Sequence, residues 1–433
     1  MKLKMKKINV ILSIVMLSVI TLSLTSCTDE ETKATCFDGI QNGSETGIDC
    51  GGVCEPCKGS FEKSGILTTD ETWTSNNIYI LNGKVVVGNG TILTIEAGTI
   101  IKGKKGTGSL ASALIVARGG KLMAKGTSDK PIVFTSVDDN IDVGQTAGTN
   151  LDENDNALWG GLILLGKAKG SFKGDVTEVQ IEGIPAGDTW GLYGGDDDTD
   201  NSGILQYISI RHGGALIGEG NEINGLTLGS VGSGTVIENI EVVGNLDDGI
   251  EFFGGTVSPK NLIVWGAGDD GLDIDQAFAG TITNSMVILG GTSDHGLEID
   301  GPEGSYEAKF TLNNITIKGN ATTSKGEYAD YRSSAMGASN NIYAYGFKDS
   351  SDIELDNDGV ATNYNDGKLT FGTWEIVLPS GVTDVKSLFV NKAETVTVTG
   401  FGDNAAAVTA GSQTVGADVS VFDWTYAKAN GAF

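Results

Sequence analysis

Three copies of a short acidic pattern hold the residues best suited to chemistry in this chain of 433 residues. Each copy reads polar residue, glycine, aliphatic residue, acid, apolar residue: Asp248-Gly249-Ile250-Glu251-Phe252, Asp270-Gly271-Leu272-Asp273-Ile274 and His295-Gly296-Leu297-Glu298-Ile299. Successive copies are 22 and 25 residues apart. Carboxylates gathered in this way can bind a cation, share protons as general acids, or stay hydrated beside scattered Lys and Arg, and all three interpretations remain open.

Calcium is the cation that such a cluster would select, because hard carboxylate oxygens are its preferred ligands. If the copies stack as strands, equivalent acids lie about 4.8 Å apart. Like charges at that distance repel by roughly 0.8 kcal/mol per pair in water, and by more near a protein surface. A bound cation would remove this repulsion. The candidate metal ligands are the outward acids of the three copies, namely Glu251, Asp273, Asp275, Glu298 and Asp300.

Short stacked strands are the elements that would position these acids. Apolar residues alternate with polar ones in every copy, which is the period of a strand. The aliphatic and apolar positions would therefore point into a core, and the acids would point out to water. A second pattern, an Asn before a strand-like run, recurs in steps of 22, 23, 30 and 27 residues at Asn239, Asn261, Asn284, Asn314 and Asn341.

Repeats of this length are typical of stacked architectures, so we predict an all-β fold, a single-stranded right-handed parallel β-helix. The Asn column predicts a turn ladder, since Asn tolerates a left-handed backbone and can hydrogen-bond the Asn of the next rung. The composition agrees, with 64 Gly, 6 Pro and a formal net charge of −27. So acidic a chain argues against nucleic acid as a partner.

The N-terminus has the pattern of a secretory signal, with Lys2 to Lys7 basic, residues 8–24 apolar and Leu24-Thr25-Ser26-Cys27 at the cut. That last run resembles a bacterial lipobox. The resemblance implies a signal peptide over 1–26, a lipid on Cys27 and attachment to a membrane through that lipid. The acidic tether over 27–35 resembles the export signal of surface lipoproteins in Bacteroidetes, and a solvated spacer is its alternative. We expect an outer-membrane protein that faces the cell exterior.

Four cysteines follow within 22 residues: Cys36, Cys50, Cys54 and Cys57. An even number in an exported protein predicts two disulfides in a module over residues 36–58. The spacing of Cys54 and Cys57 would also suit a metal knuckle, which is the alternative. The run resembles a small Cys-rich module that recurs in secreted and surface proteins of Bacteroidetes.

Strand-like segments with Asn-Gly turns continue from Gly65, as in residues 77–103. Together with residues 159–168 and the closing Phe422-Asp-Trp-Thr-Tyr426, they resemble Bacteroidetes surface β-helix proteins related in fold to pectin lyases. We expect the β-helix over residues 60–369. Residues 370–433 should form a β-rich segment whose end folds over the open end of the stack as a cap.

An enzymatic interpretation comes from a second resemblance. The runs Asn245-Leu246-Asp247, Asp269-Asp270 and His295-Gly296 are similar in order and spacing to motifs of polygalacturonases. The resemblance implies that Asp247, Asp269 and Asp270 supply the acid and the base, with His295 in support. The chain departs from the family at Leu246 and Asp294, and it lacks the basic pair that would hold a uronate. A lyase would need an Arg or Lys base beside calcium, and no such residue can be placed.

Aromatic side chains offer a third possibility, a platform on which sugars stack. The candidates are Phe253, Trp265, Tyr328, Tyr331 and Tyr343, and edge packing is the alternative. For His212 we predict a role in a turn or in the core. The sequence favours a non-catalytic protein that binds an extracellular polysaccharide or an outer-membrane partner, with calcium as the candidate cofactor. The alternative is a polysaccharide-degrading enzyme that uses the acidic edge of residues 245–300.

Overall fold

The computed structural model describes residues 36–55, 57–185, 187–216 and 222–433. The predicted signal peptide, the lipid site at Cys27 and the acidic tether all lie outside the described residues. The chain divides into two compact units, the first ending at Cys57 and the second running from Lys58 to Phe433. None of the helices formed by the described residues is long and apolar enough to span a bilayer.

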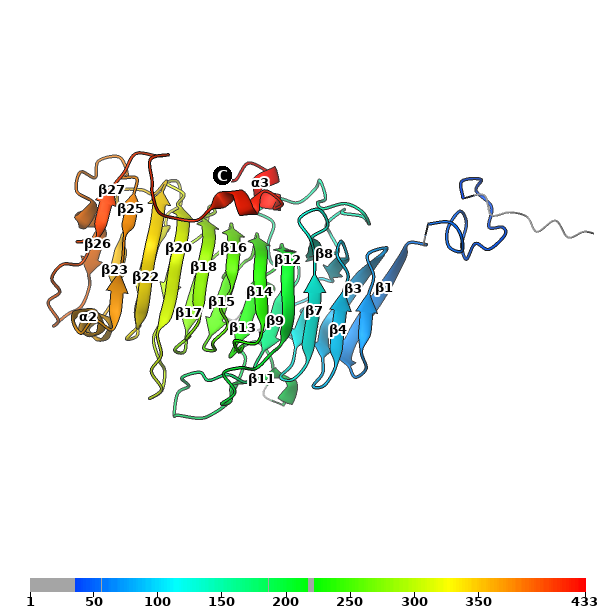
Figure 1. Cartoon of the computed structure of the whole chain (residues 1–433), viewed down its shortest axis with the longest axis horizontal. Coiled ribbons are helices and arrows are strands. Elements are labelled where there is room, and N and C mark those ends of the chain that lie inside the picture. Colours follow the sequence, from blue (N-terminus) through cyan, green and yellow to red (C-terminus); the bar gives the residue numbers. More distant parts are fainter. Residues whose placement is uncertain (1–35, 56, 186, 217–221) are drawn as a thin grey trace, which may run out of the picture. The chain divides into compact units, whose positions relative to one another are not determined.

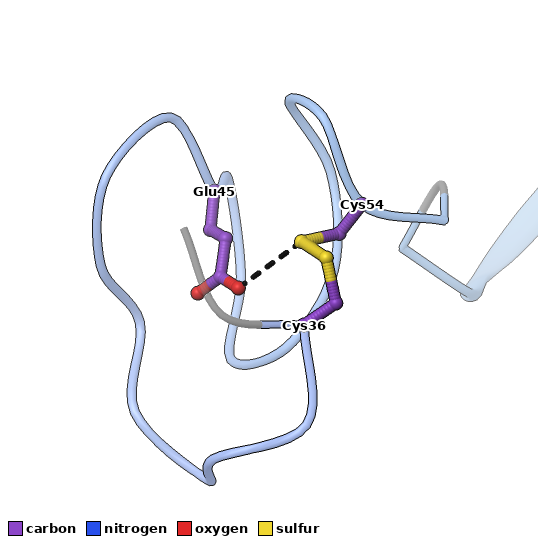
Figure 2. Close-up of side chains that lie close together, drawn as sticks. All are labelled: Cys36, Glu45 and Cys54. Atoms are coloured by element: carbon purple, nitrogen blue, oxygen red, sulfur yellow. Dashed lines mark hydrogen bonds between the residues drawn. A yellow bond between two sulfur atoms is a disulfide. The ribbon is translucent and has the colours of Figure 1, made fainter. Parts of the chain in front are cut away.

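The first unit confirms the two predicted disulfides, which join Cys36 to Cys54 and Cys50 to Cys57. Glu45 is buried beside the first of them, and its Oε1 atom lies 3.2 Å from Sγ of Cys54 (Figure 2). A sulfur in a disulfide has no proton to lose and no thiolate charge, so it is a poor metal ligand. The metal knuckle is therefore not formed, because its sulfurs are bonded to one another.

The second unit is a parallel β-helix, as predicted (Figure 1). Among its described residues, 25 strands join in one continuous sheet that winds around the core, and the strand pairings within that sheet are parallel. Each full rung contributes a strand to each of three faces. The first face contains β6 (Ala113–Val116), β9 (Leu162–Leu165), β13 (Leu226–Gly229), β15 (Ile250–Phe253), β17 (Leu272–Asp275), β19 (His295–Ile299), β21 (Glu327–Tyr331), β23 (Ile353–Leu355) and β26 (Phe389–Asn391).

The second and third faces are made by separate strands in the early and late rungs and by single long strands in between. The second face contains β2 (Glu71–Trp73), β4 (Ile92–Ile95), β7 (Lys121–Lys125) and β24 (Leu369–Phe371). The third contains β5 (Ile100–Gly103), β8 (Ile132–Ser136), β25 (Trp374–Ile376) and β27 (Ala405–Ala407). Strands that span both are β12 (Gly203–Arg211), β14 (Val236–Val243), β16 (Lys260–Trp265), β18 (Thr281–Ile288), β20 (Phe310–Lys318) and β22 (Gly337–Tyr345). At the N-terminal end, β1 (Gly59–Leu67) and β3 (Asn77–Val87) span the third and first faces.

The predicted Asn ladder makes the bend between the second and third faces. Its five residues have φ between 54° and 60°, the left-handed conformation expected of Asn. Asn261 donates its amide to Oδ1 of Asn239 at 3.0 Å, and Asn284 donates to Oδ1 of Asn261 at 2.8 Å. These bonds hold successive bends in register. In the preceding rung Tyr207 takes the same place, with φ of 51°.

The core positions of the acidic repeats were also predicted correctly. Ile250 pairs with Leu272 and Leu272 with Leu297, and all three are fully buried. The glycine before each aliphatic residue is required by packing. A Cβ on Gly249 would lie 2.3 Å from the Val264 side chain, and one on Gly271 would lie equally close to Val287. The Asp-Gly and His-Gly steps are thus explained by the close approach of the first and third faces.

Two segments outside the rungs cover the solenoid. Residues 166–202 leave the first face after β9 and contain the short antiparallel pair β10 (Val179–Gln180) and β11 (Leu192–Tyr193), with Phe172 and Tyr193 packed on that face. The other described helices are α2 (Asp358–Asn365) and the short α3 (Tyr426–Ala429), with 3₁₀ turns η2 (Gly108–Leu110), η3 (Thr189–Gly191), η4 (Val385–Leu388) and η5 (Val419–Phe422).

The C-terminal segment was expected to cap the open end, but it lies elsewhere. Residues 412–433, which we name the strap, run back along the third face from β25 to β14 and end at α3 (Figure 1). Glu375 accepts the backbone N–H of Thr414 at 2.5 Å, and Glu241 accepts that of Ala427 at 2.8 Å. The physical reason is the apolar outer side of the third face, where Ile263 and Met286 are buried by strap residues.

Candidate functional site

The outer side of the first face carries the acids in parallel columns. In the central column Glu251 lies beside Asp273, and Asp273 lies beside Glu298. The register was predicted correctly for these three rungs. It continues through two rungs that the sequence analysis missed, where Asp330 and Glu354 extend the column. The runs around them keep the alternation of apolar residue, acid and apolar residue but lack the Gly, and the alternation was the available signal.

We call this set of side chains the acidic wall. It consists of the acids on strands β15, β17, β19, β21 and β23 and in the turns at either end of them: Asp247, Asp248, Glu251, Asp269, Asp270, Asp273, Asp275, Asp294, Glu298, Asp300, Glu327, Asp330, Asp352, Glu354 and Asp356.

The central acids do not face water, which corrects the prediction from the sequence. Glu251, Asp273 and Glu298 are only 7%, 9% and 7% exposed. Neighbouring rungs and the segment 166–202 fold over them. Asn224 hydrogen-bonds Glu251, and Tyr193 lies close enough for the charge of Glu251 to raise the pKa of its hydroxyl. A solenoid surface written as polar can therefore be covered by chain from elsewhere.

Burial gives these carboxyls a strong tendency to hold protons. It raises the pKa of Glu251, Asp273 and Asp248 well above the usual range, and the charges of neighbouring acids add to the effect. Burial and the charge of Asp300 raise the pKa of Asp275 to about 7, although Arg332 counteracts them. At neutral pH the wall either carries protons or needs positive charge from another source.

Basic side chains supply that charge at the C-terminal half of the wall. Arg332 contacts Glu298 and donates from Nε to Oδ2 of Asp300 at 2.5 Å. Lys392 contacts Glu354, and Lys325 lies 2.9 Å from Asp294. The calcium ligands predicted at Glu298 and Asp300 are therefore occupied by Arg332. A guanidinium held by two carboxylates leaves them little capacity to bind a metal.

The N-terminal half lacks such partners among the described residues. Oxygen atoms of Asp248, Glu251 and Asp273 lie within 4.8 Å of one another, and we call these three residues the unpaired cluster. No salt bridge reaches them in the part of the chain that the structure describes, and Oδ1 of Asp273 is buried without a hydrogen-bond partner. Oδ1 of the neighbouring Asn224 is buried and unpartnered as well. Of the five predicted metal ligands, Glu251 and Asp273 lie in this cluster.

The four predicted catalytic residues do come together. Oxygens of Asp247, Asp248 and Asp269 lie within 4.8 Å of one another, and Nδ1 of His295 lies 2.8 Å from Oδ1 of Asp270. Burial, with the charges of Glu182 and Glu222, raises the pKa of Asp247 to about 7. For His295, burial alone would lower the pKa, but the hydrogen bond and charge of Asp270 raise it to about 9. His295 is therefore a cation in the folded protein.

Backbone contacts give Asp248 and Asp270 a structural role as well. Oδ1 of Asp248 accepts the N–H of Asp270 at 2.9 Å, and Oδ1 of Asp270 accepts the N–H of His295 at 2.7 Å. Each of these acids thus fixes the turn of the next rung. The polar segment 166–202, which brings Glu182 to the wall, could not be placed there from the sequence, because nothing in its residues specifies which rung it covers.

The expected aromatic platform is wrong, and edge packing is confirmed. Tyr328 and Tyr331 are fully buried in the core, and Phe253 packs against Tyr193. Tyr343 lies under the strap, and Trp265 packs against Tyr426. The prediction for His212 is confirmed: it is buried in a turn with φ of 63°, and its Nδ1 lies 2.8 Å from the carbonyl oxygen of Asp155.

Comparisons with known proteins agree with this architecture. The family model described as a pectate-lyase-like beta helix domain matches residues 65–428. The comparison with curated proteins found no match, and neither did the comparison with solved structures.

Proposed function

Because the chain belongs to the pectate-lyase-like β-helix family, which includes both enzymes and non-catalytic proteins, we propose that it is a non-catalytic binding protein. In this proposal the unpaired cluster binds Ca²⁺, and the bound ion recruits an extracellular polysaccharide or a partner protein. The observation that carries the proposal is the contrast within one column of acids. Arg332 and Lys392 neutralise the later rungs, whereas Asp248, Glu251 and Asp273 share no such side chain.

The ligand chemistry of the cluster suits calcium. The three carboxylates offer up to six oxygens, and Ca²⁺ takes six to eight at flexible distances. The amide oxygen of Asn224, buried and unpartnered, offers another. Coordination positions left open would be filled by hydroxyl or carboxylate oxygens of a polysaccharide, or by a carboxylate of a partner. The ion would thereby connect the acidic wall to ligands that its bare charge repels.

Calorimetric titration of the mature chain with CaCl₂ tests the metal part of the proposal. We expect a saturable site in the wild type and its loss in Asp273→Asn, which keeps the side-chain shape but removes one charge. Asp356→Asn on the same face is the matched control and should bind as the wild type does. Binding that is unchanged in Asp273→Asn would contradict the assignment. Retention of the chain on immobilised acidic polysaccharide, in calcium and in chelator, then tests the recruitment.

Catalysis is the second candidate, and the pKa of Asp247 favours it. A carboxyl that titrates near neutrality beside a second acid is suited to general acid catalysis. Two observations weigh against hydrolysis by inversion. Oxygens of Asp247 and Asp269 lie within 4.8 Å, whereas inverting glycosidases hold their carboxyls roughly 6.5–9.5 Å apart. Arg332, the nearest Arg, is held by Glu298 and Asp300.

The alternative is tested by incubating the chain with uronate-rich polysaccharides and measuring new reducing ends and unsaturated ends. Turnover by the wild type that disappears in Asp270→Asn would establish the enzyme and overturn the non-catalytic proposal. Because Asp270 also fixes a backbone turn, thermal melts must show that the variant is folded.

Attachment to the cell is part of the same proposal. The lipobox-like run that ends in Cys27 supports a lipid anchor in the outer membrane, with the β-helix facing the exterior. Labelling of cells with a radioactive fatty acid should mark the wild type and leave Cys27→Ala unmarked. Protease added to intact cells should degrade the chain, and full protection of the chain would contradict the surface location.

A further inference from the structure

A cleft beneath the strap is separate from the acidic wall. It has a volume of about 370 Å³ and lies where the strap crosses the bends of β12, β14 and β16 (Figure 1). The rung side of the cleft contributes Tyr207, Glu238, Asn239 and Lys260, and the strap contributes Asp423 and Trp424. The volume is near the lower limit of small-molecule sites, which favours one or two sugar rings over a long chain.

Trp424 brings an unused hydrogen-bond donor to this cleft. Its Nε1 is buried and has no acceptor among the described residues. Its ring meets the ring of Tyr207 edge to face, with centroids 5.5 Å apart. A buried indole N–H without a partner costs free energy, so its retention is explained if a ligand supplies the acceptor. An aromatic pair with a free donor is a common means of holding a sugar, since the rings contact C–H groups and the donor binds a hydroxyl.

Asn239 provides a second donor because the Asn ladder begins there. Its Oδ1 accepts the amide of Asn261 at 3.0 Å, and the rung before it has Tyr207 at the bend in place of Asn. The Nδ2 group of Asn239 consequently lacks the acceptor that each later Asn finds in the rung before it. Asn239 is itself only 8% exposed, so the rigid bend fixes the direction of this donor.

The charges around the cleft favour a neutral ligand. Glu238 accepts from Lys260 Nζ at 2.9 Å and from Gln206 Nε2 at 3.0 Å, so this pair is internally neutralised. Asp423 is exposed and adds one negative charge. A uronate or phosphate would meet this charge on a molecule that is already strongly acidic.

From the two unused donors, the aromatic pair and the balanced charge, we propose that the cleft binds a neutral pyranose, either free or as a unit of a neutral glycan. This site needs no metal, so it is independent of calcium binding at the unpaired cluster. The chain would then carry two recognition surfaces on different faces of one solenoid, one for a cation-bridged ligand and one for neutral sugar.

The experiment follows the indole N–H resonances of the full mature chain labelled with ¹⁵N-tryptophan. The probes are the methyl glycosides of glucose, galactose and mannose and their neutral trisaccharides, each added to millimolar concentration in the presence of chelator. We expect one indole resonance to shift on saturation, and we expect it to be the resonance that is absent in Trp424→Phe. That variant should lose at least tenfold in affinity with little change in melting temperature, because it deletes an unsatisfied donor and keeps the ring.

Two further variants keep the test decisive. Trp265→Phe makes the same substitution under the strap but outside the cleft, and it should bind sugar as the wild type does. Asn239→Asp replaces the second donor while tolerating the left-handed bend, and it should weaken binding even if Trp424→Phe fails to fold. The proposal is overturned if no probe shifts an indole resonance, if the shift survives in Trp424→Phe, or if only uronates bind.

Discussion

The sharpest prediction concerns one column of acids in which the same substitution should have opposite effects at two positions. Asp273 belongs to the unpaired cluster, whereas Glu354, two rungs beyond Glu298, contacts Lys392. Without calcium, Asp273→Asn removes a buried charge that only other negative charges surround. Glu354→Gln, in contrast, removes the partner of a cation. We expect the first variant to be more stable than the wild type and the second to be less stable.

The magnitude follows from the distances in the cluster. Ionised carboxylates within 4.8 Å repel by about 1 kcal/mol per pair in water and by about 3.5 kcal/mol at an effective dielectric constant of 20. Proton uptake relieves part of this repulsion, so we expect Asp273→Asn to gain about 1–3 kcal/mol at pH 8. For a unit of this size that corresponds to a rise in melting temperature of roughly 2–5 °C. Glu354→Gln should lose about 1–2 kcal/mol, since the side chain of Lys392 is 42% exposed and solvent replaces part of the pair.

Calcium should reverse the order of the wild type and Asp273→Asn. An ion at 100 times its dissociation constant stabilises the folded state by about 2.7 kcal/mol, and only the wild type and Glu354→Gln should gain this. Differential scanning calorimetry of the three proteins in chelator and in calcium measures every term. The reasoning is refuted if Asp273→Asn melts below the wild type in chelator, or if it keeps the full calcium response.

Three further outcomes follow from the structure. The melting temperature of the calcium-free protein should fall as pH rises from about 4 to 7, because acids such as Asp247 and Asp275, with folded pKa values of about 7, bind more protons folded than unfolded in that window; scanning calorimetry at several pH values measures it, and a rising melting temperature would contradict it. Phe422→Ala should cost roughly 3 kcal/mol in urea unfolding and make the strap sensitive to limited proteolysis, since Phe422 is fully buried against the third face. Asn261→Ala should be less stable than Asn261→Gly by about 1 kcal/mol in urea unfolding, because both lose the amide ladder but only Gly adopts φ of 58° without strain; equal stabilities would remove the backbone explanation.

The parts of the fold that repeat were predictable from the sequence. Alternation assigned Ile250 and Leu272 to the core, and the recurrence of Asn239 and Asn261 predicted the left-handed bends together with the bonds between them. These features depend on residues one rung apart, whose separation along the chain is visible as a spacing. A spacing of 22 residues becomes a contact of neighbouring strands whatever the rest of the chain does.

What covers each face was not predictable, and the errors share this cause. Period-two alternation distinguishes the inside of a rung from its outside, but it carries no information about chain that returns from a distance. Glu241 is buried because Ala427, 186 residues later, donates to it, and Glu251 is buried in part because residues 166–202 bring Tyr193 and Glu182 toward it. Polar residues on the outside of this solenoid therefore had two possible fates, open surface or covered contact, and only the three-dimensional structure separates them. The same coverage creates the candidate sites, since carboxylates in open solvent would need no cation and an exposed indole N–H would bind water.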